Sequence, residues 1–213
     1  MNIRFQPPVR TIADLLHRLG DIPAGRVRYT PVPGTATVED LLRPENKGCE
    51  LVDDTLVERP RNFGNSILAI SLVSLLDQPI RCQNLGILTG PCGTFEILSG
   101  LVRLPDVAYF SWDRLPGRRV PNEPVPKVVP DLAVEVLSSG NTLGEMTRKR
   151  DEYFRAGVRL VWEIDPRART VRAYTAVDQF RDLTAIDTLT GDPVLPGFSV
   201  PLAQLFAELD RHG

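Results

Sequence analysis

The side chains best suited to chemistry in this 213-residue sequence are a few carboxylates and one lysine. Glu135 interrupts the apolar run VPDLAVEVL at residues 129–137, where a buried strand is expected. An unpaired carboxylate buried in a strand costs several kcal/mol, so a positive charge should lie nearby. The two-residue period of a strand puts Asp131 on the same face as Glu135 but roughly 13 Å away, too far to share one ion. Glu135 therefore needs a second carboxylate from another strand if it is to bind a metal.

Asp106 and Lys149 are the predicted partners of Glu135. Asp106 opens the strand in RLPDVAYF, and strands adjacent in sequence usually pair in space. Lys149 lies three residues after Met146 and four before Tyr153, which places it on the helix stripe that packs toward the sheet. Two carboxylates on neighbouring strands suit magnesium, so we expect their oxygens within about 5 Å of each other. We also expect the Lys149 ammonium within about 4 to 6 Å of the Glu135 carboxylate.

A purely structural interpretation fits the same three residues. Asp106 would cap a strand end, Glu135 would form half of an ion pair, and Lys149 would only neutralise it. Other catalytic arrangements find little support, because the two histidines, His17 and His212, leave almost nothing for a nucleophilic triad. The stretch GILTGPCGTF lacks the Gly-Lys-Ser/Thr of a P-loop, and no GxGxxG occurs.

Composition restricts the class of protein. The length and the 42% hydrophobic content suit one domain with one core. With 25 basic and 27 acidic side chains, the protein has no overall positive charge that would attract nucleic acid. Any polyanion must therefore bind to a local basic patch. The three cysteines form no CxxC pair, which argues against a disulfide framework or zinc site and favours free thiols in a reducing compartment. No stretch approaches the ~18 apolar residues of a membrane span, so we expect a cytoplasmic protein without membrane contact.

The elements that must position these side chains alternate along the chain. Helices are predicted from Thr11 to Gly20, over 62–77, from a Thr142/Glu145 capping box to 156, and in PLAQLFAEL. Strands are predicted in two pieces over 50–59 around an Asp53-Asp54 turn, and at 85–88, 95–98, 106–111, 131–137, 158–164 and 170–175. The proline-rich stretch 114–130 is predicted as a loop. The order predicts an α/β fold with one mixed central β-sheet flanked by helices, preceded by an N-terminal arm with a short helix over 1–36.

These residues resemble the Uma-two restriction endonuclease family within the PD-(D/E)XK nuclease superfamily. The resemblance covers ELVDDTLVER, RLPDVAYFSWDRLP, the block from VPDLAVEVL through AGVRLVWEIDP to AYT, and DTLTGDPVLPGFSVPLAQLF. It implies a restriction endonuclease-like fold with a single nuclease domain over 37–213. It also implies that Asp106 and Glu135 are metal carboxylates, that Lys149 is the lysine of the motif, and that Glu50 is a further acidic residue near the metal.

The resemblance implies a metal-dependent endonuclease that hydrolyses nucleic-acid phosphodiester bonds, with DNA as the expected substrate and magnesium or manganese as the cofactor. The E-x-K tripeptide is absent, because Glu135-Val136-Leu137 ends in leucine and Lys149 must substitute in space. The usual Asp-Gly turn is Asp53-Asp54, and RPRNFGNSIL lacks the family's histidine.

Two other functions stay open at this point: a catalytically silent interaction module that retains the nuclease fold, and a phosphoesterase acting on a small nucleotide. A homodimer is one alternative for the oligomeric state. Phosphate contacts are expected from six basic residues, namely Arg114, Arg118, Arg119, Lys127, Arg148 and Arg150.

Overall fold

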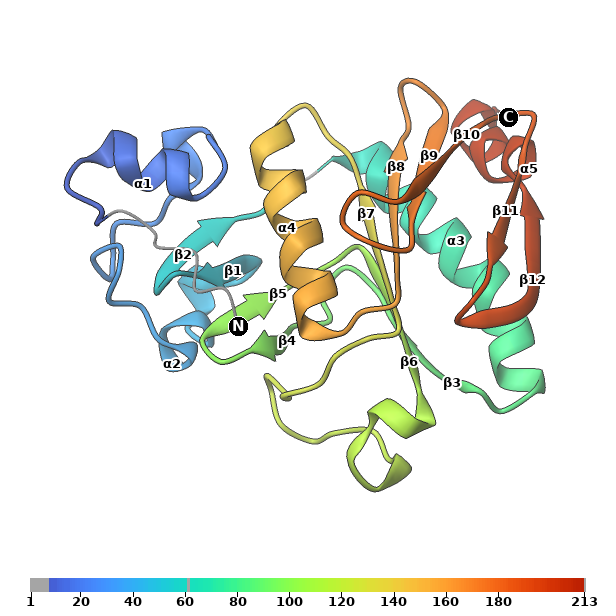
Figure 1. Cartoon of the computed structure of the whole chain (residues 1–213), viewed down its shortest axis with the longest axis horizontal. Coiled ribbons are helices and arrows are strands. Elements are labelled where there is room, and N and C mark those ends of the chain that lie inside the picture. Colours follow the sequence, from blue (N-terminus) through green and yellow to red (C-terminus); the bar gives the residue numbers. More distant parts are fainter. Residues whose placement is uncertain (1–7, 61, 213) are drawn as a thin grey trace.

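A mixed β-sheet forms the centre of the molecule in a computed structural model, which describes residues 8–60 and 62–212 (Figure 1). Within these residues the sheet has six strands in the order β10-β9-β8-β7-β6-β3. Only β7 and β8 of these described strands pair in parallel, and the helix between them makes the crossover. The strands are β3 (Gly86–Thr89), β6 (Val107–Ser111), β7 (Leu132–Val136), β8 (Leu160–Asp165), β9 (Thr170–Tyr174) and β10 (Phe180–Thr184).

The two faces of β7 differ as the alternation predicts. Leu132, Val134 and Val136 are buried in a core shared with α3 (Phe63–Cys82) and α5 (Leu202–Ala207). Ala133 and Glu135 alternate with them along the strand, and Ala133 packs in a second core with residues of α4 (Leu143–Ala156). Helices therefore cover both faces of the sheet, with α3 behind the strands and α4 in front of them in Figure 1.

Helix α3 is longer and more apolar than the sequence interpretation allowed. It continues through Pro79 to Cys82, and by length and composition it would qualify to cross a bilayer, contrary to the expectation that no segment approaches a membrane span. Its stripe from Leu68 through Leu72 and Leu76 to Ile80 is fully buried against the sheet. This packing accounts for the apolar residues on one face of α3, whereas Phe63 and Ile70 on the same helix are exposed.

Helix α4 begins and ends at the predicted residues. Thr142 Oγ1 accepts a hydrogen bond from the Glu145 backbone nitrogen, and Gly157 ends the helix in a left-handed conformation. The reciprocal half of the predicted capping box differs, because the Glu145 carboxylate bonds to Arg26 and Asn141 instead. Glu145 therefore ties α4 to Arg26 in the segment before residue 37.

A second sheet has the order β2-β1-β5-β4 among the described residues, and ion pairs join it to Lys149 and Glu152 of α4. Its strands are β1 (Cys49–Val52), β2 (Thr55–Glu58), β4 (Phe95–Leu98) and β5 (Leu101–Arg103), and α2 (Val38–Leu41) lies against it. Asp53 and Asp54 form the predicted turn between β1 and β2, with φ of 48° and 51°. Both lie in the left-handed region that this hairpin turn requires.

The segment before residue 37 packs on the rest of the chain. Thr11 and Asp14 form the predicted capping box of α1 (Ile12–Arg18). Gly20 has a φ of +90° and lies so close to α4 that an added Cβ would stand 2.3 Å from the Glu145 nitrogen. Leu15, Leu19 and other apolar residues of this segment belong to the core under α4.

The 3-10 helices of the described residues are η1 (Ala24–Arg26), η2 (Pro44–Asn46), η3 (Trp112–Arg114), η4 (Pro116–Arg118) and η5 (Glu208–Asp210).

The prediction of one sheet was incomplete, because the described residues form three. Four strands have no predicted counterpart: β5, β10 and the two strands of the third sheet, β11 (Thr188–Gly191) and β12 (Leu195–Pro201). β5 has only three residues, and the exposed side chains of β10 hide the apolar alternation of a half-buried strand. The other predicted strands and helices are present, and most of them have ends shifted by a few residues, which is the usual uncertainty of element boundaries.

Candidate functional site

Four acidic and basic side chains from four different elements meet where the two larger sheets join. Asp106 immediately precedes β6, Glu135 is on β7, Lys149 is on α4 and Glu50 is on β1. Asp106 and Glu135 approach because Asp106 lies beside β7: its backbone nitrogen donates to the Val134 carbonyl at 2.9 Å. The antiparallel β6/β7 pairing thus brings the two predicted metal carboxylates together.

Lys149 joins two of the carboxylates. Its Nζ lies 3.0 Å from Glu50 Oε1 and 3.2 Å from Glu135 Oε1, closer to Glu135 than the expected range. All three side chains are buried, and Lys149 is only 1% exposed. Tyr153, one turn further along α4, donates its hydroxyl to the same Glu135 oxygen at 2.7 Å. The negative charge of Glu135 is therefore compensated by Lys149, as the sequence predicted.

Glu50 is held from both sides. Its Oε2 accepts from Arg103 Nη1 at 2.7 Å, and its Oε1 accepts from the Leu104 backbone nitrogen at 3.2 Å as well as from Lys149. Arg103 also donates its Nε and Nη2 to the Glu152 carboxylate. Both oxygens of Glu50 are thus occupied within the protein, and Glu50 and Glu135 together hold the Lys149 ammonium.

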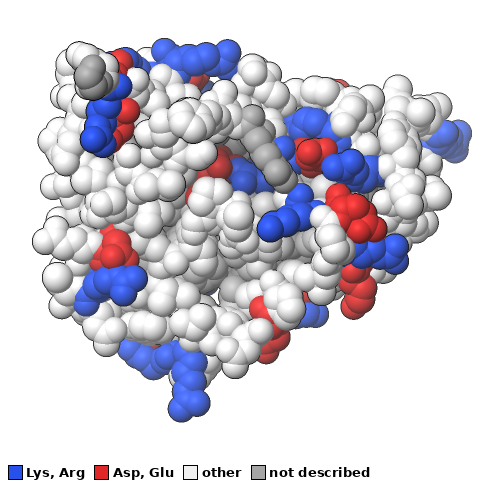
Figure 2. Space-filling model, turned by 180° about the vertical axis from the view of Figure 1, so that it is seen from behind, with Lys and Arg blue, Asp and Glu red and all other residues white. Residues whose placement is uncertain are grey.

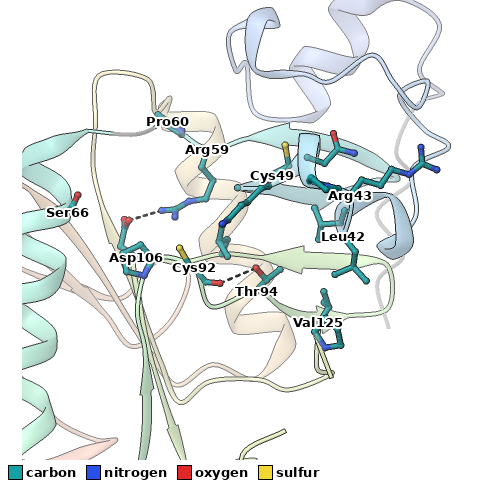
Figure 3. Close-up of a pocket in the computed structure, with 18 of the residues that line it drawn as sticks. Leu42, Arg43, Cys49, Arg59, Pro60, Ser66, Cys92, Thr94, Asp106 and Val125 are labelled. Carbon is teal, nitrogen blue, oxygen red and sulfur yellow. Dashed lines mark hydrogen bonds and ion pairs between the residues drawn. The ribbon is translucent and has the colours of Figure 1, made fainter. Parts of the chain in front are cut away.

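Asp106 and Glu135 face a second cation, Arg59. Its Nη2 donates to Asp106 Oδ1 at 2.9 Å (Figure 3). The same nitrogen lies 3.7 Å from Glu135 Oε2. The other Asp106 oxygen, Oδ2, accepts from the Val136 backbone nitrogen at 2.7 Å. One oxygen of each carboxylate is therefore used by the fold, and the remaining two face the same guanidinium.

The ionisation of the cluster follows from these contacts. Burial raises the pKa of Glu135, and Lys149 and Arg59 only partly offset it because the neighbouring carboxylates Glu50 and Asp106 act in the same direction as burial. Burial would also raise the pKa of Glu50, but Lys149 and Arg103 outweigh it and hold that pKa below the ordinary value. Burial would lower the pKa of Lys149, yet Glu135 and Glu50 raise it, so the lysine stays protonated at neutral pH.

A cavity of about 700 Å³ opens next to this cluster. Asp106, Arg59, Cys92, Thr94 and Leu42 are among the described residues that line it (Figure 3). Its described lining also includes Lys47 and Arg43, the latter 2.9 Å from Asp40 at the surface. The cavity thus gives solvent and ligands access to the Asp106 side of the cluster, while Lys149 lies deeper, under α4.

The six basic residues expected to contact phosphate lie outside the described lining of the cavity. Arg114 bonds to Asp131, Arg148 to Glu152 and Asp53, and Arg150 to Glu163, so these three guanidinium groups serve the packing around the sheet. None of the six is among the described residues that line the cavity, and the basic residues found there are Arg43, Lys47 and Arg59. Figure 2 shows basic and acidic side chains next to one another in separate clusters on the face opposite to that of Figure 1. This face therefore has no broad basic surface for a polyanion, and any contact with nucleic acid would have to be local.

The Asp106–Glu135 pair suits a hydrated divalent ion that needs only two protein ligands, and not a metal that needs three or more. Within the described residues no group of three or more His, Cys, Asp or Glu side chains is arranged to hold a metal. Two carboxylate oxygens that converge on one cation nevertheless meet the requirement of magnesium, which keeps most of its water. Asp106 Oδ1 and Glu135 Oε2 are the atoms that would bind it.

The sequence analysis missed three contributors to the site. Tyr153 could have been found, because it lies four residues after Lys149 on the same helix stripe. Arg103 and Arg59 carried no local signal, since their carboxylate partners lie 47 or more residues away in sequence.

Comparisons with known proteins bear on the family and the fold. A family model described as "Putative restriction endonuclease" matches residues 36–203. A crystal structure of a "putative nuclease belonging to DUF820" from Anabaena variabilis is similar in fold, with a TM-score of 0.71, 19% identity, and coverage of 81% of this chain and 98% of that one. The comparison with curated proteins gave no significant match. Because the family model spans well over half of the sequence, the chain belongs to the Uma2 family of restriction endonuclease-like proteins.

Proposed function

We propose that this protein is a metal-dependent endonuclease that hydrolyses phosphodiester bonds in DNA. The observation that carries the proposal is the convergence of Asp106 Oδ1 and Glu135 Oε2 on one position at the wall of an open cavity, with a buried, charged lysine directly behind. A magnesium or manganese ion held there would supply Lewis-acid activation of the scissile phosphate and of a water molecule.

Lys149 acts in this proposal as a fixed positive charge. Its raised pKa keeps the ammonium protonated, so it cannot accept a proton from the attacking water at neutral pH. It holds Glu135 Oε1 at 3.2 Å, and Tyr153 holds the same atom at 2.7 Å. The carboxylate is thereby locked with Oε2 turned toward Asp106, which is the kind of preorganisation that electrostatic catalysis needs.

The cavity supports a nucleic-acid substrate. Arg43 and Lys47 line it beyond Asp106, so a phosphodiester at the carboxylate pair would have its neighbouring phosphates within a basic passage. Few cationic contacts predict weak affinity with a shallow salt dependence, because the salt slope scales with the number of phosphates that are neutralised. We expect the passage, and not the proline-rich loop, to contact the backbone.

Cleavage of supercoiled plasmid with Mg²⁺ or Mn²⁺, compared with EDTA, tests the proposal. Asp106→Asn and Glu135→Gln should each reduce nicking by about a hundredfold or more, as expected when a metal carboxylate is lost. Asp113→Asn is a matched control, because this carboxylate is exposed and pairs only with Arg118 in the described structure. Parent protein that leaves DNA intact with both metals would contradict the proposal and favour a catalytically silent module.

A further inference from the structure

Arg59 occupies the two carboxylate oxygens that a metal ion would need. Asp106 Oδ2 is committed to the Val136 nitrogen, and Glu135 Oε1 to Lys149 and Tyr153. The oxygens that remain, Asp106 Oδ1 and Glu135 Oε2, lie 2.9 and 3.7 Å from Arg59 Nη2. A guanidinium and a divalent cation cannot both take this position, because they would share ligands and repel each other.

Arg59 is held less completely than the other buried arginine of the cluster. Arg103 uses Nε, Nη1 and Nη2 to bind two carboxylates. Arg59 Nε, in contrast, is buried and has no hydrogen-bond partner among the described residues. An unsatisfied buried donor costs free energy, which lowers the barrier to moving this side chain.

Space for that movement is present. Arg59 lines the cavity of about 700 Å³, and its guanidinium lies between Asp106 and the open volume (Figure 3). A rotation about its flexible stem would bring the charge into the passage lined by Arg43 and Lys47. The side chain could therefore leave the carboxylates without entering a packed core.

We propose that Arg59 is an internal, displaceable cation that competes with the divalent metal for Asp106 and Glu135. This inference rests on the proposed metal-dependent function. With Arg59 in place the carboxylate pair is neutralised and the protein is stable without metal. Metal binding requires Arg59 to withdraw into the cavity, where its charge is available to a substrate phosphate. The apparent metal affinity is accordingly reduced by the population of the Arg59-bound state.

Calorimetric titration with Mn²⁺ alone, without nucleic acid, tests the competition in the full-length protein. Arg59→Met should bind Mn²⁺ about tenfold or more tightly than the parent, because a charge in contact with both ligands has been removed. Arg28→Met is the control for a general loss of positive charge, since Arg28 pairs with Glu58 at 3.0 Å and not with the metal carboxylates. It should change the Mn²⁺ affinity by less than about twofold.

A second measurement keeps the test independent of the folding of one variant. The rise in melting temperature on adding Mn²⁺ should be larger for Arg59→Met than for the parent, and Arg59→Lys, which retains the charge, should lie between them. If Asp106→Asn abolishes Mn²⁺ binding while Arg59→Met binds no more tightly than the parent, a metal site exists but Arg59 is not its competitor, and the inference is wrong. If neither the parent nor Arg59→Met binds Mn²⁺, the proposed function itself fails, and the inference with it.

Discussion

Substitution of Lys149 by methionine tests how much its buried ion pairs with Glu50 and Glu135 contribute to stability. The change removes an ammonium that is 1% exposed and lies 3.0 Å from Glu50 Oε1 and 3.2 Å from Glu135 Oε1. Breaking a buried ion pair typically costs about 3–5 kcal/mol of unfolding free energy. Glu50 keeps Arg103 and Glu135 keeps Tyr153, so we expect a loss near the lower end, about 3 kcal/mol.

Urea unfolding at neutral pH measures this loss. Arg155→Met on the same helix is the matched control, because Arg155 is exposed and lies 3.5 Å from Asp151. An exposed pair of this kind is worth about 0–1 kcal/mol. The loss in Lys149→Met should shrink as the pH falls, since Glu135 already has a raised pKa and takes up a proton once its lysine is gone.

Added metal and plasmid cleavage separate the stabilising role of Lys149 from a role in catalysis. Mn²⁺ should stabilise Lys149→Met more than the parent, because the ion supplies the charge that Glu135 has lost. Cleavage at saturating metal should fall by about a hundredfold or more if the lysine also preorganises the carboxylate. A variant as stable as the Arg155→Met control would refute the buried ion-pair reasoning, and one that cleaves DNA at the parent rate would refute the catalytic assignment.

Three further outcomes follow from the contacts around the cluster. Arg103→Met should lose about 3–5 kcal/mol in urea unfolding, because it leaves Glu50 and Glu152 without their shared partner, and a loss below about 1 kcal/mol would contradict this. Glu50 has a lowered pKa, so its stabilisation is present above the ordinary value of 4.5 and is lost as the pH falls toward the folded value. The melting temperature of Glu50→Gln should therefore change less between about pH 6 and pH 3.5 than that of the parent, and an unchanged slope would argue against the shift. Arg26→Met should speed backbone hydrogen exchange in residues 11–28, because the 2.6 Å pair with Glu145 ties this segment to α4, and unaltered exchange there would show that apolar packing alone suffices.

The local sequence was sufficient to predict the main helices, most strands of the central sheet and the pairing of Lys149 with Glu135. A carboxylate inside VPDLAVEVL and a lysine on the sheet-facing stripe of the next helix both violate ordinary burial preferences, and the structure brings them to 3.2 Å. The Asp53-Asp54 turn and the ends of α4 were equally visible, because their signals lie within a few residues of one another. Short or exposed strands such as β5 and β10 were not, since neither gives enough apolar residues to show a period.

Only the tertiary structure decided which cations stand at which carboxylates. Arg59 and Arg103 reach Asp106, Glu50 and Glu152 from 47 to 53 residues away, a separation over which propensity and periodicity carry no information. The sequence also did not show that three of the residues expected to contact phosphate are ion-paired in the fold. Arg114 of the proline-rich loop pairs with Asp131, and on α4 Arg148 pairs with Glu152 and Arg150 with Glu163. Side-chain type and spacing therefore determined that a charged cluster must exist, whereas the packing of the two larger sheets against α4 determined its partners, its burial and the side from which it opens to solvent.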